Sequence, residues 1–299
     1  MSYRSCTNDD CSDKGNNWDG TSYDANTLIN LSSLGANRYF QFKANFKIIE
    51  VGETPTIPEP DSIPGLALWL KADAITGVSD GQKISTWNDS SGNNRNFSQG
   101  TSSRQPTYET NELNGLPVIR FIGSSIQTMT NSTNFSAPVT VIYMVRQTGG
   151  YNNRMLSGLS NNWLLGYWSS AKNKAYFVGW VTSSTAGSPA TDTSWHTYSA
   201  VIPGSSASSA YGDGALLASN SGGVSGPNGL SLSGHQASSE FSNGEIAEVI
   251  VYNSALNTTN RETVEAYLAE KYGFSPAQEP QIFPQATPKL ADVNIVYTN

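Results

Sequence analysis

The sequence predicts an all-β protein: an antiparallel two-sheet jelly-roll sandwich with one C-terminal helix, flanked by a small split β module. Three observations lead to this fold class. Charged residues make up only 14% of the 299 residues, below the usual ~25%. Short β-prone runs separated by turn residues fill the middle of the chain, with no helices between them. Proline-rich segments bracket that middle on both sides.

The composition also excludes several classes of function. Aromatic residues reach 10% of the chain, including 7 Trp and 14 Tyr, which is enough to build a core. The formal net charge is -7 and no stretch gathers Lys and Arg into a stripe, so nucleic acid is not an expected partner. No run of 18 apolar residues occurs and Met1 leads into polar residues, so we expect neither membrane insertion nor a signal peptide in this sequence.

Six apolar runs carry the strand prediction for the middle of the chain. They are residues 66–70, 118–122, 139–145, 175–181, 195–201 and 246–252. One helix is predicted after them, with Thr259 as N-cap, Glu262 completing a capping box and Gly273 ending the helix. Its apolar face is formed by Val264, Tyr267, Leu268 and Tyr272, and we expect this face to pack on the sandwich.

Two further runs with a period of two, residues 38–47 and 290–297, lie outside the proline-rich segments. The termini of a compact domain usually lie close together, so the middle can be an insertion between two neighbouring strands. We therefore expect these two strands to pair as antiparallel neighbours. The expected division is 1–54 for the first part of the flanking β module, 55–62 as linker, 63–274 for the jelly roll, 275–287 as linker and 288–299 for the returning strand. The alternative is a loosely docked head and tail.

Four motifs in the middle domain resemble the laminin G-like, or concanavalin A-like, jelly-roll domains of bacterial surface proteins. They are the opening strand at 63–73, the Trp-Asn-Asp-Ser-Ser-Gly-Asn turn at 87–93, the Asn-Gly strand at 114–121, and the closing strand and helix at 243–273. The outer strands resemble, over a shorter length, the paired last strands of a small β-sandwich repeat in such proteins. The resemblance implies a cell-surface or extracellular location and contact with carbohydrate or another surface ligand.

Carbohydrate contact needs exposed flat aromatic rings beside amide or charged groups, because a sugar stacks its apolar face and hydrogen-bonds with its hydroxyls. One stretch of the sequence has this composition. The candidate ligand-binding residues are Tyr151, Arg154, Asn161, Trp163, Tyr167 and Trp168. The alternative is that these rings fill a curved sheet.

Calcium is the one cofactor that the resemblance suggests, because many domains of this kind hold Ca²⁺ on a sandwich rim with oxygen ligands. The oxygen-rich candidates are Asp73, Asp80, Asp89, Asn93 and Asn94. The alternative is that the Asp-Ser-Ser-Gly-Asn segment forms a tight Asx turn without a metal.

Catalysis is not expected. Jelly-roll glycoside hydrolases place two carboxylates on the same face of a strand, and the nearest match here is Glu245 and Glu248, whose spacing of three predicts opposite faces. His196 and His235 are the only histidines, and neither has the nucleophile that a catalytic triad requires.

Cys6 and Cys11 are the only cysteines, and their spacing suits a small disulfide loop but offers too few ligands for a structural zinc site. A disulfide would indicate an oxidising compartment. The alternative is two free thiols.

Two functional hypotheses follow. The first is a non-catalytic extracellular binding or adhesion module, similar to a lectin, that contacts a glycan or surface protein through the rim of the jelly roll. The second is a structural subunit of a filament or surface layer that self-associates through the flanking strands. The ligand and the oligomeric state do not follow from the sequence.

Overall fold

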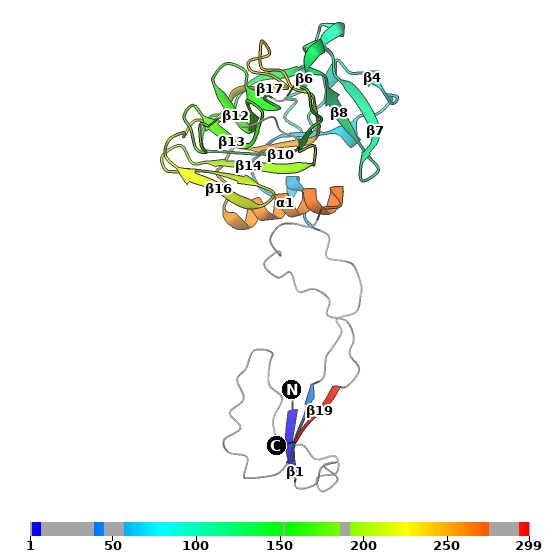
Figure 1. Ribbon diagram of the computed structural model, residues 1–299, viewed down its shortest axis with the longest axis vertical. Helices are drawn as coiled ribbons and strands as arrows, with labels where there is room; N and C mark the ends of the chain where they lie inside the picture. The colour runs from blue at the N-terminus through cyan, green and yellow to red at the C-terminus, as the bar shows by residue number, and fades with distance from the viewer. Residues whose placement is uncertain are drawn as a thin grey trace. The chain divides into compact units, whose positions relative to one another are not determined.

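The computed structural model describes residues 2–6, 39–44, 57–151, 153–185, 192–274 and 293–298 (Figure 1). The chain divides into two compact units. Unit 1 consists of Met1–Thr56 together with Ile282–Asn299, and unit 2 consists of Ile57–Gln281. Unit 2 therefore interrupts unit 1 in the sequence.

Unit 1 contains a three-stranded antiparallel sheet. Its strands, in sheet order, are β1 (Ser2–Cys6), β2 (Tyr39–Ala44) and β19 (Val293–Thr298). In the central strand, Phe42 is aligned with Tyr3 of β1 and with Ile295 of β19. The predicted antiparallel pairing of two strands that are far apart in sequence is thus confirmed, over a ladder that is shorter than the runs seen in the sequence.

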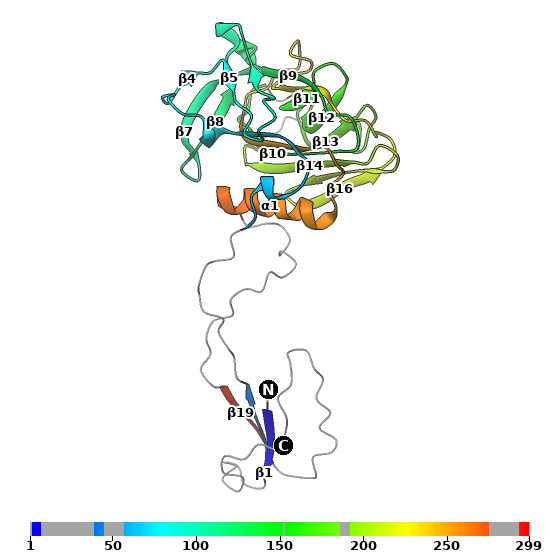
Figure 2. The same cartoon turned by 180° about the vertical axis from the view of Figure 1, so that it is seen from behind.

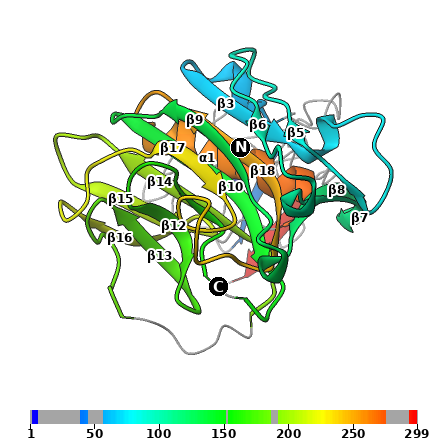
Figure 3. The ribbon, with the colours of Figure 1, turned by 90° about the horizontal axis from the view of Figure 1, so that it is seen from above.

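Unit 2 is a β-sandwich of two antiparallel sheets, as its alternation of short β-prone runs and turns predicted. In the described residues, the strands of the nine-stranded sheet are, in sheet order, β16 (Ala215–Asn220), β15 (Ser208–Gly212), β14 (His196–Ile202), β10 (Val139–Gln147), β18 (Gly244–Tyr252), β8 (Leu116–Phe121), β7 (Thr107–Leu113) and β4 (Gln82–Lys83). The ninth strand, β3 (Leu66–Lys71), also pairs with β18. Those of the seven-stranded sheet are β13 (Ala171–Phe177), β12 (Trp163–Trp168), β11 (Leu156–Gly158), β17 (Asn228–Leu232), β9 (Met129–Asn134), β6 (Phe97–Ser98) and β5 (Thr86–Trp87). Figure 3 looks onto the seven-stranded sheet, with the nine-stranded sheet behind it.

The sandwich has two apolar cores because the nine-stranded sheet is covered on both faces. The main core lies between the sheets and includes Leu68, Phe121, Val141 and Leu232. The second core lies on the outer face of the nine-stranded sheet, where α1 (Thr258–Tyr272) packs across it (Figures 1 and 2). The strand β18 lies at the centre of the sheet between the two cores and is buried at every position. This is why β18 reads as a nearly continuous apolar run.

The helix packs as its stripe predicted, but its first turn differs. Val264 and Leu268 are fully buried in the second core, and Gly273 ends the helix in the left-handed conformation with φ 74°. The N-cap is Asn257, not Thr259, and its side chain accepts a hydrogen bond of 2.8 Å from Asn260 N. Several N-cap formers occur in a row here, and the sequence favoured the one that completed a capping box. No helix in the described residues is long and apolar enough to cross a membrane.

Candidate ligand-binding site at the rim of the sandwich

Two of the aromatic residues proposed for ligand contact belong to the main core. Trp163 and Tyr167 are at most 1% exposed, and both point between the sheets from β12. The Trp163 ring stacks on Phe177 with centroids 5.4 Å apart, and Tyr167 meets Tyr198 edge-on at 5.4 Å. Neither ring is available to a ligand, so at these two positions the alternative holds and the rings fill the sheet interface.

The other candidates are spread over the seven-stranded sheet and its loops. Trp168 lies at the end of β12 on the opposite face from Trp163 and is partly exposed, and Tyr151 is 49% exposed. Arg154 is buried, with its Nε 2.6 Å from Glu240 Oε2. Burial lowers the pKa of the Arg154 guanidinium, while the charge of Glu240 opposes this effect. Arg154 therefore holds a loop in place and does not extend toward solvent.

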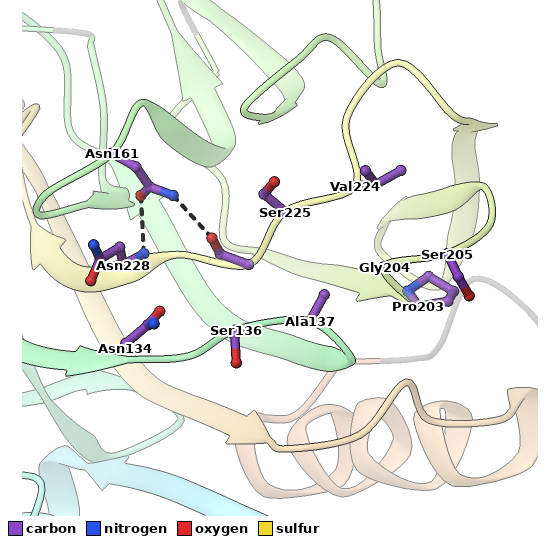
Figure 4. Close-up of a pocket in the computed structure, with 11 residues that line it drawn as sticks. Asn134, Ser136, Ala137, Asn161, Pro203, Gly204, Ser205, Val224, Ser225 and Asn228 are labelled. Atoms are coloured by element: carbon purple, nitrogen blue, oxygen red, sulfur yellow. Dashed lines mark hydrogen bonds between the residues drawn. The ribbon is translucent and has the colours of Figure 1, made fainter.

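Asn161 lines a pocket at one end of the sandwich, which we call the rim pocket (Figure 4). Asn161 Nδ2 donates to Gly226 O at 3.0 Å, and its Oδ1 accepts from Asn228 N at 3.0 Å. Both ends of the amide are thus occupied by backbone groups. Asn161 fixes the wall of the pocket rather than offering hydrogen bonds to a ligand.

The rim pocket is built from four loops that meet at one end of the sandwich. They connect β9 to β10, β11 to β12, β14 to β15, and β16 to β17. The volume of the pocket is about 530 Å³. The lining residues are Asn134, Ser136, Ala137, Asn161, Pro203, Gly204, Ser205, Val224, Ser225, Gly226 and Asn228. Loops carried on a rigid sandwich are a common location for binding residues.

The chemistry of the rim pocket is polar and uncharged. None of its lining residues is ionisable. The side chains of Asn134, Ser136, Ser205, Ser225 and Asn228 make no hydrogen bond within the described part of the chain, so their donors and acceptors remain for solvent or a ligand. The site was hard to find from the sequence, because its residues are spread from Asn134 to Asn228 and only Asn161 lies beside an aromatic cluster in sequence.

Of the residues proposed for calcium, Asp73 and Asp80 each have a partner of their own. Asp73 forms an ion pair with Lys271 at 3.0 Å, and Asp80 Oδ1 accepts from Thr110 N at 2.7 Å. The backbone and side-chain hydrogen bonds from Thr110 lower the pKa of the Asp80 carboxyl. Within the described residues, no three His, Cys, Asp or Glu side chains gather in a way that could hold a metal ion.

Asp89 instead organises the turn after Trp87. Its Oδ1 accepts from Trp69 N at 3.0 Å and from Ser91 N at 2.9 Å, and its Oδ2 accepts from Ser91 Oγ at 2.8 Å and Arg95 N at 3.0 Å. Asn93 adds a hydrogen bond of 3.1 Å from its Nδ2 to Leu66 O. Asn94, next in the turn, has a positive φ of 55°. This is the arrangement of an Asx turn that ties the loop to β3.

Glu245 and Glu248 do not lie on opposite faces of β18, and this expectation was wrong. A β-bulge opposite Met144 and Val145 of β10 leaves Ala247 as an extra residue in β18. The bulge shifts the alternation, so that Glu245, Ala247 and Glu248 all reach the outer face of the nine-stranded sheet. Both glutamates are fully buried there.

Each glutamate is held by partners of its own. Glu245 accepts from Arg120 Nε and from Arg146 Nε, both at 2.6 Å. Glu248 accepts from Lys271 Nζ and Tyr272 Oη, both at 2.9 Å, and from Trp69 Nε1. The two carboxylates thus serve different ion-pair and hydrogen-bond networks.

Burial raises the pKa of the Glu248 carboxyl, and the charge of Lys271 with the hydrogen bonds from Trp69 and Tyr272 works against that rise. Three donors on one buried carboxylate are what such a group needs in an apolar surrounding. Glu248 therefore fastens α1 to the sheet.

The proposed disulfide between Cys6 and Cys11 involves a residue, Cys11, that lies outside the described residues. The pairing stays a prediction.

No family model matches the chain, and no curated protein matches it. Among solved structures, the chain is similar to the binding domain of Paraclostridial Mosquitocidal Protein 1, with a TM-score of 0.46 and 14% identity over 71% of this chain and 53% of that one. It is also similar to domain 4 of AbnA, a GH43 extracellular arabinanase from Geobacillus stearothermophilus in complex with arabinotriose, with a TM-score of 0.45 and 15% identity over 67% of this chain and 97% of that one.

A third similar structure is Trypanosoma rangeli sialidase, with a TM-score of 0.42 and 13% identity over 71% of this chain and 34% of that one. The chain thus spans about half of the first of these proteins and about a third of the sialidase. Similarity of this extent carries no inference about ligand or activity. The chain's own structure defines a two-sheet β-sandwich with an uncharged pocket at its rim.

Proposed function

We propose that unit 2 is a non-catalytic, laminin G-like carbohydrate-binding module that acts outside the cell and takes a neutral glycan into the rim pocket. The observation that carries the proposal is the chemistry of the lining. The pocket combines hydroxyl and amide groups with no ionisable residue.

A neutral sugar is a dense array of hydroxyl groups, each of which donates and accepts hydrogen bonds. Ser205 and Asn134 offer the matching groups from two different loops, and Pro203 and Ala137 add apolar surface between them. Charged ligands fit less well, because the pocket has no group to replace the hydration of an anion or cation. Pockets of this kind fix the orientation of a ligand with a few placed polar groups.

A binding role also agrees with how the candidate acids are used. Glu245 and Glu248 are each committed to cationic partners beneath the surface, which leaves neither available to protonate a leaving group or activate water. Neither residue lines the rim pocket.

The test is a screen of the full chain against an array of neutral and acidic glycans, followed by calorimetry with the best neutral glycan. Replacing Ser205 by Ala together with Asn134 by Ala should weaken binding about thirtyfold, because each change removes a polar contact worth roughly 1 kcal/mol. The Ser206→Ala variant is the matched control, since Ser206 is an exposed neighbour that does not line the pocket.

Binding of a neutral glycan should change little between low and high ionic strength, because no charge pair contributes to it. Failure of every neutral glycan to bind, or equal binding by the double variant and the wild type, would overturn the proposal.

A further inference from the structure

A cluster of three aromatic rings lies on the outer face of the seven-stranded sheet. The Trp168 and Trp180 centroids are 5.0 Å apart at 61°, and the Tyr176 and Trp180 centroids are 5.1 Å apart at 76°. All three residues are partly exposed. We call this set the aromatic cluster.

The aromatic cluster is not part of either apolar core. Tyr167 and Phe177 point into the main core from β12 and β13, so Trp168 and Tyr176, which adjoin them in sequence, point to the opposite face. The helix α1 covers the other sheet and does not reach this face. The edge-to-face contacts among the rings hold them in fixed orientations without burying them.

A short segment joins the aromatic cluster to the rim pocket. At one end, Gly222 packs against the backbone of Trp180 so closely that a Cβ there would overlap Trp180 O. At the other end, Gly226 packs in the same way against Phe135 O and lines the rim pocket. Ser225 lies between them and donates from its backbone N to Phe177 O at 3.2 Å. Four peptide steps span at most ~14 Å, so the two surfaces are neighbours.

The charged groups next to the aromatic cluster are engaged. Lys172 pairs with Asp192, and Lys174 Nζ donates to Ser183 O at 3.1 Å and to Thr185 O at 2.8 Å. The aromatic cluster therefore offers ring faces without a cation free to select an anionic ligand, and it shares the uncharged character of the rim pocket.

We infer that the ligand is a linear neutral oligosaccharide rather than a single sugar, and that the sugars outside the rim pocket stack on the aromatic cluster. This inference rests on the proposed function. The rim pocket would hold one residue through its hydroxyl groups, and the rings would bind the apolar faces of the following residues. Stacking on rigid rings costs little conformational entropy, so affinity should rise with chain length.

The experiment measures binding of mono-, di-, tri- and tetrasaccharides of the cello-, manno- and malto-series by calorimetry. It uses the full-length wild type and the Trp168→Ala, Trp168→Phe and Leu216→Ala variants. Leu216 is 58% exposed on β16 and serves as the matched apolar control. We expect Trp168→Ala to bind the longer chains about tenfold more weakly than the wild type and the monosaccharide with unchanged affinity. A tenfold loss is typical of truncating one aromatic contact.

Trp168→Phe, which keeps a ring, should retain most of the gain with chain length, and Leu216→Ala should bind like the wild type. If Trp168→Ala binds every chain length as the wild type does, the aromatic cluster is not a subsite, while the rim pocket proposal stands. If Trp168→Ala weakens the monosaccharide and the tetrasaccharide equally, the effect is structural and the inference fails. If no saccharide binds the wild type, the proposed function fails first.

Discussion

The two sheets of unit 2 share one core, yet their outer faces are covered differently. The nine-stranded sheet is covered by α1, and its central strand β18 is buried at all nine positions. Within the part of the chain that the structure describes, no helix covers the outer face of the seven-stranded sheet, where Trp168 and Tyr176 are partly exposed. On the first sheet, Glu245 and Glu248 are buried as paired and hydrogen-bonded groups, whereas the outer face of the second sheet carries partly exposed rings. Ligand contact is therefore expected on the outer face of the second sheet and at the rim pocket beside it, to which the β14–β15 loop of the first sheet also contributes.

The strongest way to break this comparison is to remove apolar contacts under the helix. Leu268 is fully buried in the second core, so Leu268→Ala should lower the free energy of unfolding by about 3 kcal/mol through lost burial and the cavity left behind. Val178→Ala, on a residue in the bend just after β13 that is 49% exposed, should change it by no more than about 0.5 kcal/mol. Urea denaturation measures both. Equal effects of the two variants would mean that the packing of α1 on the sheet does not stabilise the sandwich.

A smaller effect is expected where the helix begins. Asn257→Ala removes the hydrogen bond to Asn260 N, so the free energy of unfolding should fall by about 1 kcal/mol. Thr259→Ala is the control, because Thr259 lies within the first turn and its side chain makes no capping hydrogen bond. If Thr259→Ala lowers the free energy of unfolding more than Asn257→Ala does in the same denaturation assay, the N-cap is Thr259, as the sequence pattern alone predicted.

The smallest effect concerns pH. Burial raises the pKa of Glu248 in the folded chain above its ordinary value of 4.5, so the folded state binds this proton more tightly than the unfolded state does. Stability should therefore decline as the pH rises from 4.5 through the raised pKa. Burial also raises the pKa of Glu265 on α1, which acts in the same direction.

Glu248→Gln should flatten part of this decline, because the amide can still accept from Trp69 and Tyr272 but no longer titrates. Thermal melting across a pH series measures the slope. An unchanged slope in Glu248→Gln would show that other groups set the pH dependence.

Much of the fold could be predicted because it depends on patterns local in sequence. Short β-prone runs located six strands of the middle domain, and the Val264 to Tyr272 stripe with Gly273 located the helix. The pairing of β2 with β19 was predictable because both runs alternate and both adjoin proline-rich segments.

The candidate site was less predictable because it depends on which face of a strand turns inward. Alternation along β12 shows that Trp163 and Tyr167 point to one face of their sheet and Trp168 to the opposite face. It does not show which of these faces packs against the nine-stranded sheet. The bulge at Ala247, which brought Glu245 and Glu248 to one face, leaves no mark in the sequence. The rim pocket depends on four loops meeting, so only Asn161 was identified beforehand.

The interruption of unit 1 by unit 2 also sets an order of events during synthesis. Ala44 of β2 and its ladder partner Val293 of β19 are 293 − 44 = 249 residues apart. At roughly 5–20 residues per second, a ribosome needs on the order of 10–50 s between making the two strands. The whole of unit 2 leaves the ribosome in that interval and has time to fold first. The sheet of unit 1 is completed only after β19 has been made. Until then β2 lacks this partner strand on one edge, and a chaperone or a second nascent chain can bind to that edge.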